Sequence, residues 1–255
     1  MSSIGKFYLT FLFATIYSFC CAASSVRFAF LTDTHISTDD TLSSKHLLRL
    51  IDLINTVDSI DFIVVGGDVT HKADSASLKH AKYLLDQLDR PYFCIAGNHD
   101  HHQFTTQTFQ QIFSNDKFCF TQEGLRFIGF SPTPQQESAE AIIPESTLLW
   151  IKQQISNKEP NILLCHYPLQ QGDIANLHML TQCFDSSNIL IVLSGHYHRY
   201  MLMEFQNMPN IVNRAPQRTG DSTIGYTLYD IDHNTIRIYE HICGEQPNLW
   251  MVFPR

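Results

Sequence analysis

Eight side chains that can bind metal ions or transfer protons recur in five separate stretches of the sequence. In chain order they are Asp33, His35, Asp68, Asn98, His99, His166, His196 and His198. Imidazole, carboxylate and amide oxygen, without a thiolate, form a mixed nitrogen and oxygen donor set that suits manganese, iron, zinc or cobalt. These residue types therefore predict a metal centre, and histidine is also a frequent proton-transfer group.

Two pairs within this set are separated by a single residue. Asp33 with His35, and His196 with His198, each lie two positions apart. Side chains two apart on an extended segment point the same way, so each pair can offer two ligands to one pocket. One such pair alone is weak evidence, because short motifs arise by chance. We base the prediction on all five stretches together and on their order.

Each stretch follows a short apolar run, as expected where a buried strand delivers polar groups to the edge of a sheet. The runs span residues 26–31, 61–65, 91–96, 161–164 and 189–193. Apolar residues at helical spacing predict helices over 45–57 and 77–88, between the first three runs. This βαβαβ order predicts a parallel or mixed sheet with helices on its faces and ligands at the carboxyl ends of its strands.

The C-terminal tail has a different pattern. Residues 226–231 and 235–241 alternate with period two and are joined by Asp232-His233-Asn234, which is typical of a β-hairpin. We expect this hairpin to form a second sheet of antiparallel character. No internal repeat and no linker rich in glycine, serine or proline interrupts the chain, so we expect a single domain over residues 24–255.

The composition limits the class of ligand. The chain has 255 residues, of which 44% are hydrophobic and 16% charged, and this fits a globular domain with a sizeable core. The formal net charge is −8, and no cluster of lysine or arginine is present, so no nucleic-acid polymer is expected as a partner. A small anionic substrate would need positive charge from another source, such as metal ions.

The N-terminus has the order of segments of a secretory signal peptide. Lys6 precedes an apolar stretch over residues 7–19, and small residues follow at 22–25. We expect cleavage after Ala23, which makes residues 1–23 a signal peptide and the mature chain periplasmic or secreted. The apolar stretch is too short for a comfortable membrane span, so no stable span is expected after its removal. The alternatives are an uncleaved anchor and a buried helix.

The polar stretches resemble the motifs of the calcineurin-like metallophosphoesterase superfamily. The resemblance extends over about residues 27–198 and rests on Asp33-Thr34-His35, Gly67-Asp68, Gly97-Asn98-His99-Asp100, His166 and Gly195-His196-Tyr197-His198. It implies an α/β fold, a four-layer αββα sandwich of two mixed β-sheets flanked by helices. The compact size and the Gly-Asn-His-Asp block are most similar to the cyclic-nucleotide phosphodiesterase type.

The resemblance also implies roles for these side chains around two metal ions. Its ligand assignment is Asp33, His35 and His198 for one ion, Asn98, His166 and His196 for the other, and Asp68 as the bridge. His99 would contact phosphate and protonate the leaving oxygen, although it could instead orient a metal ligand. Asp100 would anchor the loop or a ligand imidazole. Two divalent or trivalent ions, manganese, iron or zinc, would activate a hydroxide that attacks phosphorus.

These features together predict an exported hydrolase of small phosphoesters, with phosphodiesters preferred. The alternatives are a phosphomonoesterase of the same fold, a binding module that keeps the fold without catalysis, and a single-metal storage or sensor protein. We expect specificity to lie around residues 131–143 and 205–218, where Arg214 and Arg218 either contact phosphate or lie on the surface. His71 stands where purple acid phosphatases have an iron-binding tyrosine. It could coordinate a metal ion, touch substrate or face solvent, and we expect the last.

Overall fold

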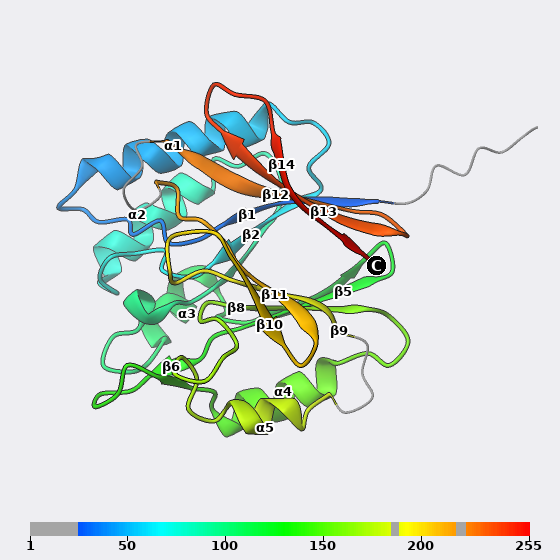
Figure 1. Cartoon of the computed structure of the whole chain (residues 1–255). Helices are drawn as coiled ribbons and strands as arrows, with labels where there is room; N and C mark the ends of the chain where they lie inside the picture. The colour runs from blue at the N-terminus through cyan, green and yellow to red at the C-terminus, as the bar shows by residue number, and fades with distance from the viewer. Residues whose placement is uncertain (1–24, 185–188, 218–222) are drawn as a thin grey trace, which may run out of the picture.

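The computed structural model describes residues 25–184, 189–217 and 223–255, which include two six-stranded sheets stacked face to face (Figure 1). Helices cover the outer face of each sheet, and the result is an αββα sandwich of four layers. The expected α/β fold is therefore confirmed. The signal peptide predicted for residues 1–23 lies outside the described residues, so it stays a prediction, as does export.

The first sheet has the strand order β14-β13-β12-β1-β2-β3. Its strands are β1 (Val26–Leu31), β2 (Phe62–Gly66), β3 (Tyr92–Ile95), β12 (Gly225–Ile231), β13 (Thr235–Ile242) and β14 (Asn248–Pro254). The predicted hairpin is present as β12 and β13, but it extends this sheet through antiparallel pairing of β12 with β1. Our expectation that it forms the second sheet is wrong, because alternation identifies the buried face of a strand but not its partner.

The second sheet has the strand order β10-β11-β9-β8-β5-β4. Its strands are β4 (Phe118–Gln122), β5 (Leu125–Phe130), β8 (Asn161–Cys165), β9 (Ile189–Ser194), β10 (Met201–Phe205) and β11 (Met208–Val212). Strands β5, β8, β9 and β11 are parallel, and antiparallel β4 and β10 form the two edges. Beside this sheet lies a short ribbon of β6 (Thr133–Pro134) and β7 (Ala141–Ile142).

Five α-helices of the described residues form the outer layers. α1 (Thr41–Asn55), α2 (Ser75–Leu85) and α3 (Gln107–Phe113) cover the first sheet, and α4 (Glu145–Gln154) and α5 (Leu177–Thr181) cover the second. The side chains of Asp40 and Asp74 accept hydrogen bonds from the first-turn N–H groups of α1 and α2. These caps start both helices earlier than apolar spacing alone predicts. No helix in the described parts of the chain is long and apolar enough to cross a membrane.

The core between the two sheets is rich in aromatic rings. Phe28 stacks on Phe62 with ring centroids 5.2 Å apart and on Tyr229 with centroids 4.8 Å apart. Phe127 of the second sheet meets Phe28 edge to face at 5.5 Å. Large buried rings in these geometries contribute strongly to packing and have specific orientations. This core therefore fixes how the two sheets lie relative to each other.

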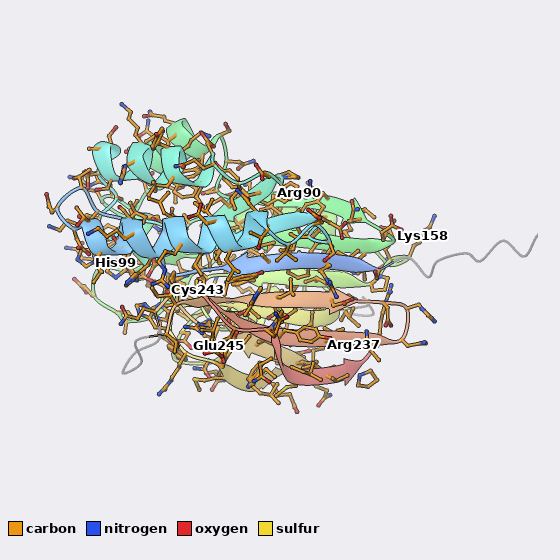
Figure 2. All side chains as sticks on the ribbon, turned by 90° about the horizontal axis from the view of Figure 1, so that it is seen from above. Arg90, His99, Lys158, Arg237, Cys243 and Glu245 are labelled. Atoms are coloured by element: carbon orange, nitrogen blue, oxygen red, sulfur yellow. The ribbon has the colours of Figure 1, made fainter. Side chains whose placement is uncertain are left out.

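The carboxyl ends of β1, β2, β3, β8 and β9 lead into loops that meet at one end of the sandwich. His99 lies at this end, whereas Lys158 and Arg237 lie at the opposite end (Figure 2). The polar side chains that follow these strands are thus brought together by strand direction, as the βαβαβ order predicts.

Arg214, which follows β11, is fully buried. Its guanidinium pairs with the Glu240 carboxylate at 2.5 Å and donates hydrogen bonds to the main-chain oxygens of Ala215, Pro216 and Thr223. We expected Arg214 either to contact phosphate or to lie on the surface, and both expectations are wrong. The arginine instead fixes the connection from the second sheet back to the first. Arg218 lies outside the described residues.

Replacing Arg214 by alanine should lower the free energy of unfolding by about 3 kcal/mol or more, because it removes a buried cation together with its hydrogen bonds. As a control, Lys82→Ala removes an exposed ion pair with Asp86 on α2, and it should cost less than about 1 kcal/mol. Urea unfolding followed by circular dichroism measures both variants. Equal losses would contradict the structural role of Arg214.

Candidate metal centre

The predicted metal ligands converge, but their backbone is not extended. Asp33, His35, Asp68, His196 and His198 all have positive φ, between 46° and 72°. Such left-handed conformations cost about 1 to 3 kcal/mol each and persist only where the surroundings hold them, often at functional sites. The pairs therefore converge through tight turns, and our explanation by alternation along an extended segment is wrong.

Four of the predicted ligands form a first cluster. Asp33, His35, Asp68 and His198 offer ligand atoms that all lie within 4.8 Å of one another. Nε2 of His198 lies 3.2 Å from Oδ1 of Asp33 and 3.1 Å from Nε2 of His35. Nε2 of His35 lies 3.7 Å from Oδ2 of Asp68. Two imidazoles and two carboxylates at these distances form a donor set that fits a divalent transition-metal ion.

Asp68 also belongs to a second cluster, with His166 and His196. Nε2 of His166 lies 3.2 Å from Oδ2 of Asp68. Among the described residues, this buried nitrogen makes no hydrogen bond of good geometry despite its closeness to Asp68, and the buried Oδ1 of Asn98 has no hydrogen-bond partner. Buried polar atoms are normally satisfied, so these two atoms fit a second cation. Asn98 lies beside the cluster, because the next residue, His99, donates its backbone N–H to Asp68 at 2.9 Å.

The charges of the two clusters depend on one another. Burial would lower the pKa of His166, but the Asp68 and Asp33 carboxylates raise it to about 10. Burial would raise the pKa of Asp68, but His166 and His35 hold it well below its usual value. Burial lowers the pKa of His35 to about 4 despite the nearby carboxylates. Without metal ions, His166 therefore carries a proton at neutral pH and His35 does not.

A metal ion that binds His166 must displace its proton, because only the neutral imidazole offers a lone pair. Since the pKa of His166 is raised to about 10, metal affinity should rise with pH across the neutral range and fall on acidification. Calorimetric titration of the metal-free protein with zinc chloride should show release of protons at pH 7. Two buffers with different ionisation enthalpies measure this release, and identical heats in both would contradict the prediction.

Asp100 holds the loops that follow β2 and β3 against each other. Its carboxylate accepts hydrogen bonds from the N–H groups of Gly97, Val69 and Thr70 and from the Thr70 hydroxyl, at 2.8 to 3.0 Å. Burial, and then the neighbouring Asp68, raise the pKa of Asp100 to about 6. Asp100 thus anchors the loop, which is one of the two roles we expected for it.

Gly97 leaves no room for a side chain, because a Cβ atom there would overlap the backbone nitrogen and the carboxylate of Asp68. Gly97→Ala should therefore displace Asp68, lower the free energy of unfolding by about 1 to 3 kcal/mol, and reduce the number of metal ions bound per chain. Denaturant unfolding and elemental analysis measure the two effects. Unchanged metal content would contradict the prediction.

Gly124→Ala is the matched control for this substitution. Gly124 has φ of 72°, and no other described atom lies within 4 Å of an added Cβ. Alanine there should lower stability through backbone strain and leave metal content unchanged, because Gly124 lies in the turn between β4 and β5.

His99, the predicted proton donor, is half-buried beside the first cluster. Its ring centroid lies 4.7 Å from that of His35. Its Nδ1 lies 2.8 Å from the main-chain oxygen of His71. A carbonyl oxygen only accepts, so Nδ1 carries the hydrogen and Nε2 remains available for proton exchange. His71 is exposed, as expected, but its ring also stacks on His99 with centroids 5.4 Å apart.

A hydrogen-bonded network that no sequence motif predicts lies beside His196 and His198. Tyr197, which lies between them, donates its hydroxyl to the Asp173 carboxylate at 2.7 and 2.8 Å. Gln170 donates to Asp173 at 2.6 Å and to the Tyr197 hydroxyl at 2.8 Å. Burial and Asp173 raise the pKa of Tyr197 to about 12, so its hydroxyl stays protonated at neutral pH. No spacing in the sequence links these three residues.

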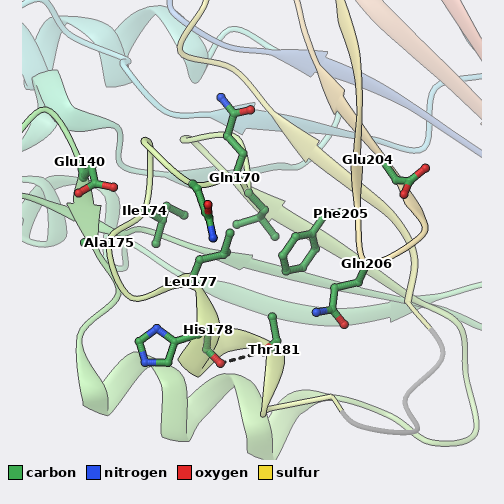
Figure 3. Close-up of a pocket in the computed structure, with 12 residues that line it drawn as sticks. Glu140, Gln170, Ile174, Ala175, Leu177, His178, Thr181, Glu204, Phe205 and Gln206 are labelled. Carbon is green, nitrogen blue, oxygen red and sulfur yellow. Dashed lines mark hydrogen bonds between the residues drawn. The ribbon is translucent and has the colours of Figure 1, made fainter.

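A cavity of about 880 Å³ lies between α5 and the β10–β11 hairpin (Figure 3). Both stretches that we predicted to carry specificity border it, one through Glu140 and the other through Phe205 and Gln206. Gln170 lines it too, and so connects it to the network around Tyr197. The lining residues in the described part of the chain include no lysine or arginine, so this cavity lacks the charges that would bind phosphate.

Comparison with protein families gives a match that fits this geometry. A family model described as calcineurin-like phosphoesterase matches residues 26–200. A probable glycerophosphodiester phosphodiesterase of Arcobacter nitrofigilis is 26% identical over 194 residues, which cover 66% of this chain and 70% of that protein. A serine/threonine-protein phosphatase of Rattus norvegicus is 27% identical over 183 residues, or 60% of this chain and 58% of that protein. A probable cyclic nucleotide phosphodiesterase of Fibrobacter succinogenes is 22% identical over 227 residues, which cover 80% of this chain and 85% of that protein.

Solved structures show the same fold at low sequence identity. A dimetal phosphatase from Danio rerio superimposes with a TM-score of 0.71 at 10% identity, covering 88% of this chain and 98% of that one. A purple acid phosphatase from Lupinus luteus superimposes with a TM-score of 0.63 at 14% identity, covering 91% of this chain and 54% of that one. At such identities the likeness concerns the fold alone.

Proposed function

We propose that this chain, which belongs to the calcineurin-like phosphoesterase family, is a phosphodiesterase that works with two metal ions. One observation carries the proposal: the Asp68 carboxylate belongs to both ligand clusters, as a bridging ligand between two ions must.

Fold alone does not fix function. A binding module without catalysis is less favoured, because every predicted ligand and His99 are present in the sequence.

We assign the ligands according to the two clusters. The division is Asp33, His35 and His198 for one ion, His166 and His196 for the other, and Asp68 for both. We add Asn98 to the second ion because its buried Oδ1 has no hydrogen-bond partner among the described residues. The donors suit manganese, iron or zinc. When bound, such ions supply Lewis-acid charge that polarises a phosphoryl group and lowers the pKa of water.

The charge of the site favours an anionic substrate. The ligand set carries two negative charges, on Asp33 and Asp68, because histidine ligands are neutral. With two divalent cations the site has a net charge of about +2. The rest of the chain is acidic, with a formal net charge of −8, so binding of a phosphoester depends on this local excess of positive charge.

His99 is the residue that we assign to protonation of the leaving alcohol. The hydrogen bond from its backbone N–H to Asp68 and that from its Nδ1 to His71 hold the residue in place at 2.9 and 2.8 Å. Nε2 is thus the atom that holds and releases the proton. A positioned general acid typically contributes about 10²- to 10⁴-fold in rate, and the contribution is largest where the leaving alkoxide is strongly basic.

The names of the relatives support a diester substrate. Those from Arcobacter nitrofigilis and Fibrobacter succinogenes are named as probable phosphodiesterases, for glycerophosphodiesters and for cyclic nucleotides. The rat relative is named as a protein phosphatase and the Danio rerio structure as a dimetal phosphatase. Phosphomonoesters are therefore the second candidate class of substrate.

The test compares leaving groups. The chain is loaded with manganese, iron or zinc and assayed on an alkyl phosphodiester, on bis(4-nitrophenyl) phosphate and on 4-nitrophenyl phosphate. We expect the diesters to be preferred and Asp68→Asn to abolish turnover. His99→Ala should slow hydrolysis of the alkyl diester about 10²-fold or more. It should slow that of the nitrophenyl esters far less, because nitrophenolate departs without a proton.

Asp86→Asn and His233→Ala are the matched controls, because both residues are exposed and lie outside the two clusters. Both variants should keep the parental activity. Preference for the monoester would move the assignment to a phosphatase. Absence of turnover above the Asp68→Asn background, with two ions bound, would favour the binding module.

A further inference from the structure

We propose that Tyr197 and Asp173 form a positioning pair that directs His196 to one metal cluster and His198 to the other. The inference rests on the proposed two-metal site. His196 belongs to the cluster with His166, and His198 belongs to the cluster with Asp33. Two histidines separated by one residue thus serve different clusters, and Tyr197 is the residue between them.

The backbone conformation on both sides of Tyr197 is unfavourable and persists only where other contacts hold it. His196 and His198 have φ of 72° and 55°, so a left-handed residue lies on each side of the tyrosine. Upstream, the loop is fixed by hydrogen bonds from the Gly195 N–H to the His166 oxygen and from the His196 N–H to the Asp33 carboxylate. Within the described residues, the Tyr197 N–H donates only to the main-chain oxygen of Gly195, two residues upstream, at 2.9 Å. At Tyr197 itself, the side chain therefore supplies the tether to the rest of the protein.

Asp173, the residue that binds the Tyr197 hydroxyl, is itself held in place. It is 7% exposed, and its main-chain oxygen accepts a hydrogen bond from the Ala141 N–H of β7 at 2.7 Å. Its carboxylate accepts from the Tyr197 hydroxyl and from Gln170 at 2.6 to 2.8 Å. Hydrogen bonds to a carboxylate are roughly twice as strong as those between neutral groups. The tyrosine ring is therefore held at its far end by a charged group that cannot move freely.

In this arrangement, the hydrogen bond of the Tyr197 hydroxyl holds the directions in which the His196 and His198 side chains point. With the Tyr197 hydroxyl held at Asp173, the adjacent left-handed residues turn their rings toward separate clusters. Release of the hydroxyl lets the backbone of all three residues relax, although every metal ligand is still present. Loss of the pair should therefore weaken metal binding without removing a ligand, and groups that orient metal ligands typically contribute about 10- to 100-fold in affinity.

The test measures metal binding directly. The metal-free protein is titrated with zinc chloride in a calorimeter. We expect two ions in the parental protein, and about tenfold weaker binding of at least one of them in Tyr197→Phe and Asp173→Ala. Asp173→Asn keeps a carbonyl oxygen that can accept from the tyrosine, so it should retain most of the affinity. Tyr197→Phe keeps the ring and removes only the hydroxyl that donates to Asp173, so weaker metal binding in this variant distinguishes positioning by a hydrogen bond from a general need for bulk.

Tyr200→Phe is the matched control. The Tyr200 hydroxyl lies 3.0 Å from the Thr227 hydroxyl, away from Asp173, so metal affinity should not change. Thermal unfolding of each metal-free variant shows whether it is folded, and Tyr197→Phe, which removes one hydroxyl, carries the test if Asp173→Ala does not fold. Two ions bound with parental affinities in Tyr197→Phe would overturn the inference and leave the proposed function intact. Fewer than two ions in the parental protein would overturn both.

Discussion

The buried negative charge of Asp68 is the constraint on which the rest of this structure depends. Asp68 is 2% exposed, and its carboxylate lies 3.2 Å from His166, which follows β8 of the other sheet. A buried carboxylate is tolerated only where opposite charge and hydrogen bonds surround it. The His99 N–H supplies one hydrogen bond. Gly97, by lacking a side chain, and Asp100, by joining the two loops, hold these partners at the required distance.

The fold meets this constraint through strand direction and packing. Parallel strands of both sheets end at the same side of the molecule, so short loops from either sheet can reach Asp68. The aromatic core around Phe28 sets the separation of the sheets and hence the distance between the two sets of loops. The histidines that follow strands of the second sheet therefore depend for their position on aromatic rings buried between the two sheets.

Local patterns allowed the sequence to predict the strand ends and the polar residues that follow them, because a buried strand and its loop are encoded by neighbouring residues. Contacts between distant segments could not be predicted in this way. Examples are the pairing of β12 with β1, the burial of Arg214 against Glu240, and the bond from Tyr197 to Asp173. The β10–β11 hairpin was missed because its turn residues, Gln206 and Asn207, have positive φ without the glycine that usually marks such a turn.

Each ligand cluster takes side chains from both sheets. Asp33, His35 and Asp68 follow strands of the first sheet, and His166, His196 and His198 follow strands of the second. An ion in either cluster would therefore cross-link the two halves of the sandwich. Ligands that bind only the folded state stabilise it. Ions bound there would thus also stabilise the fold, and their loss would weaken the contact between the two sheets at the end of the sandwich where the ligand clusters lie.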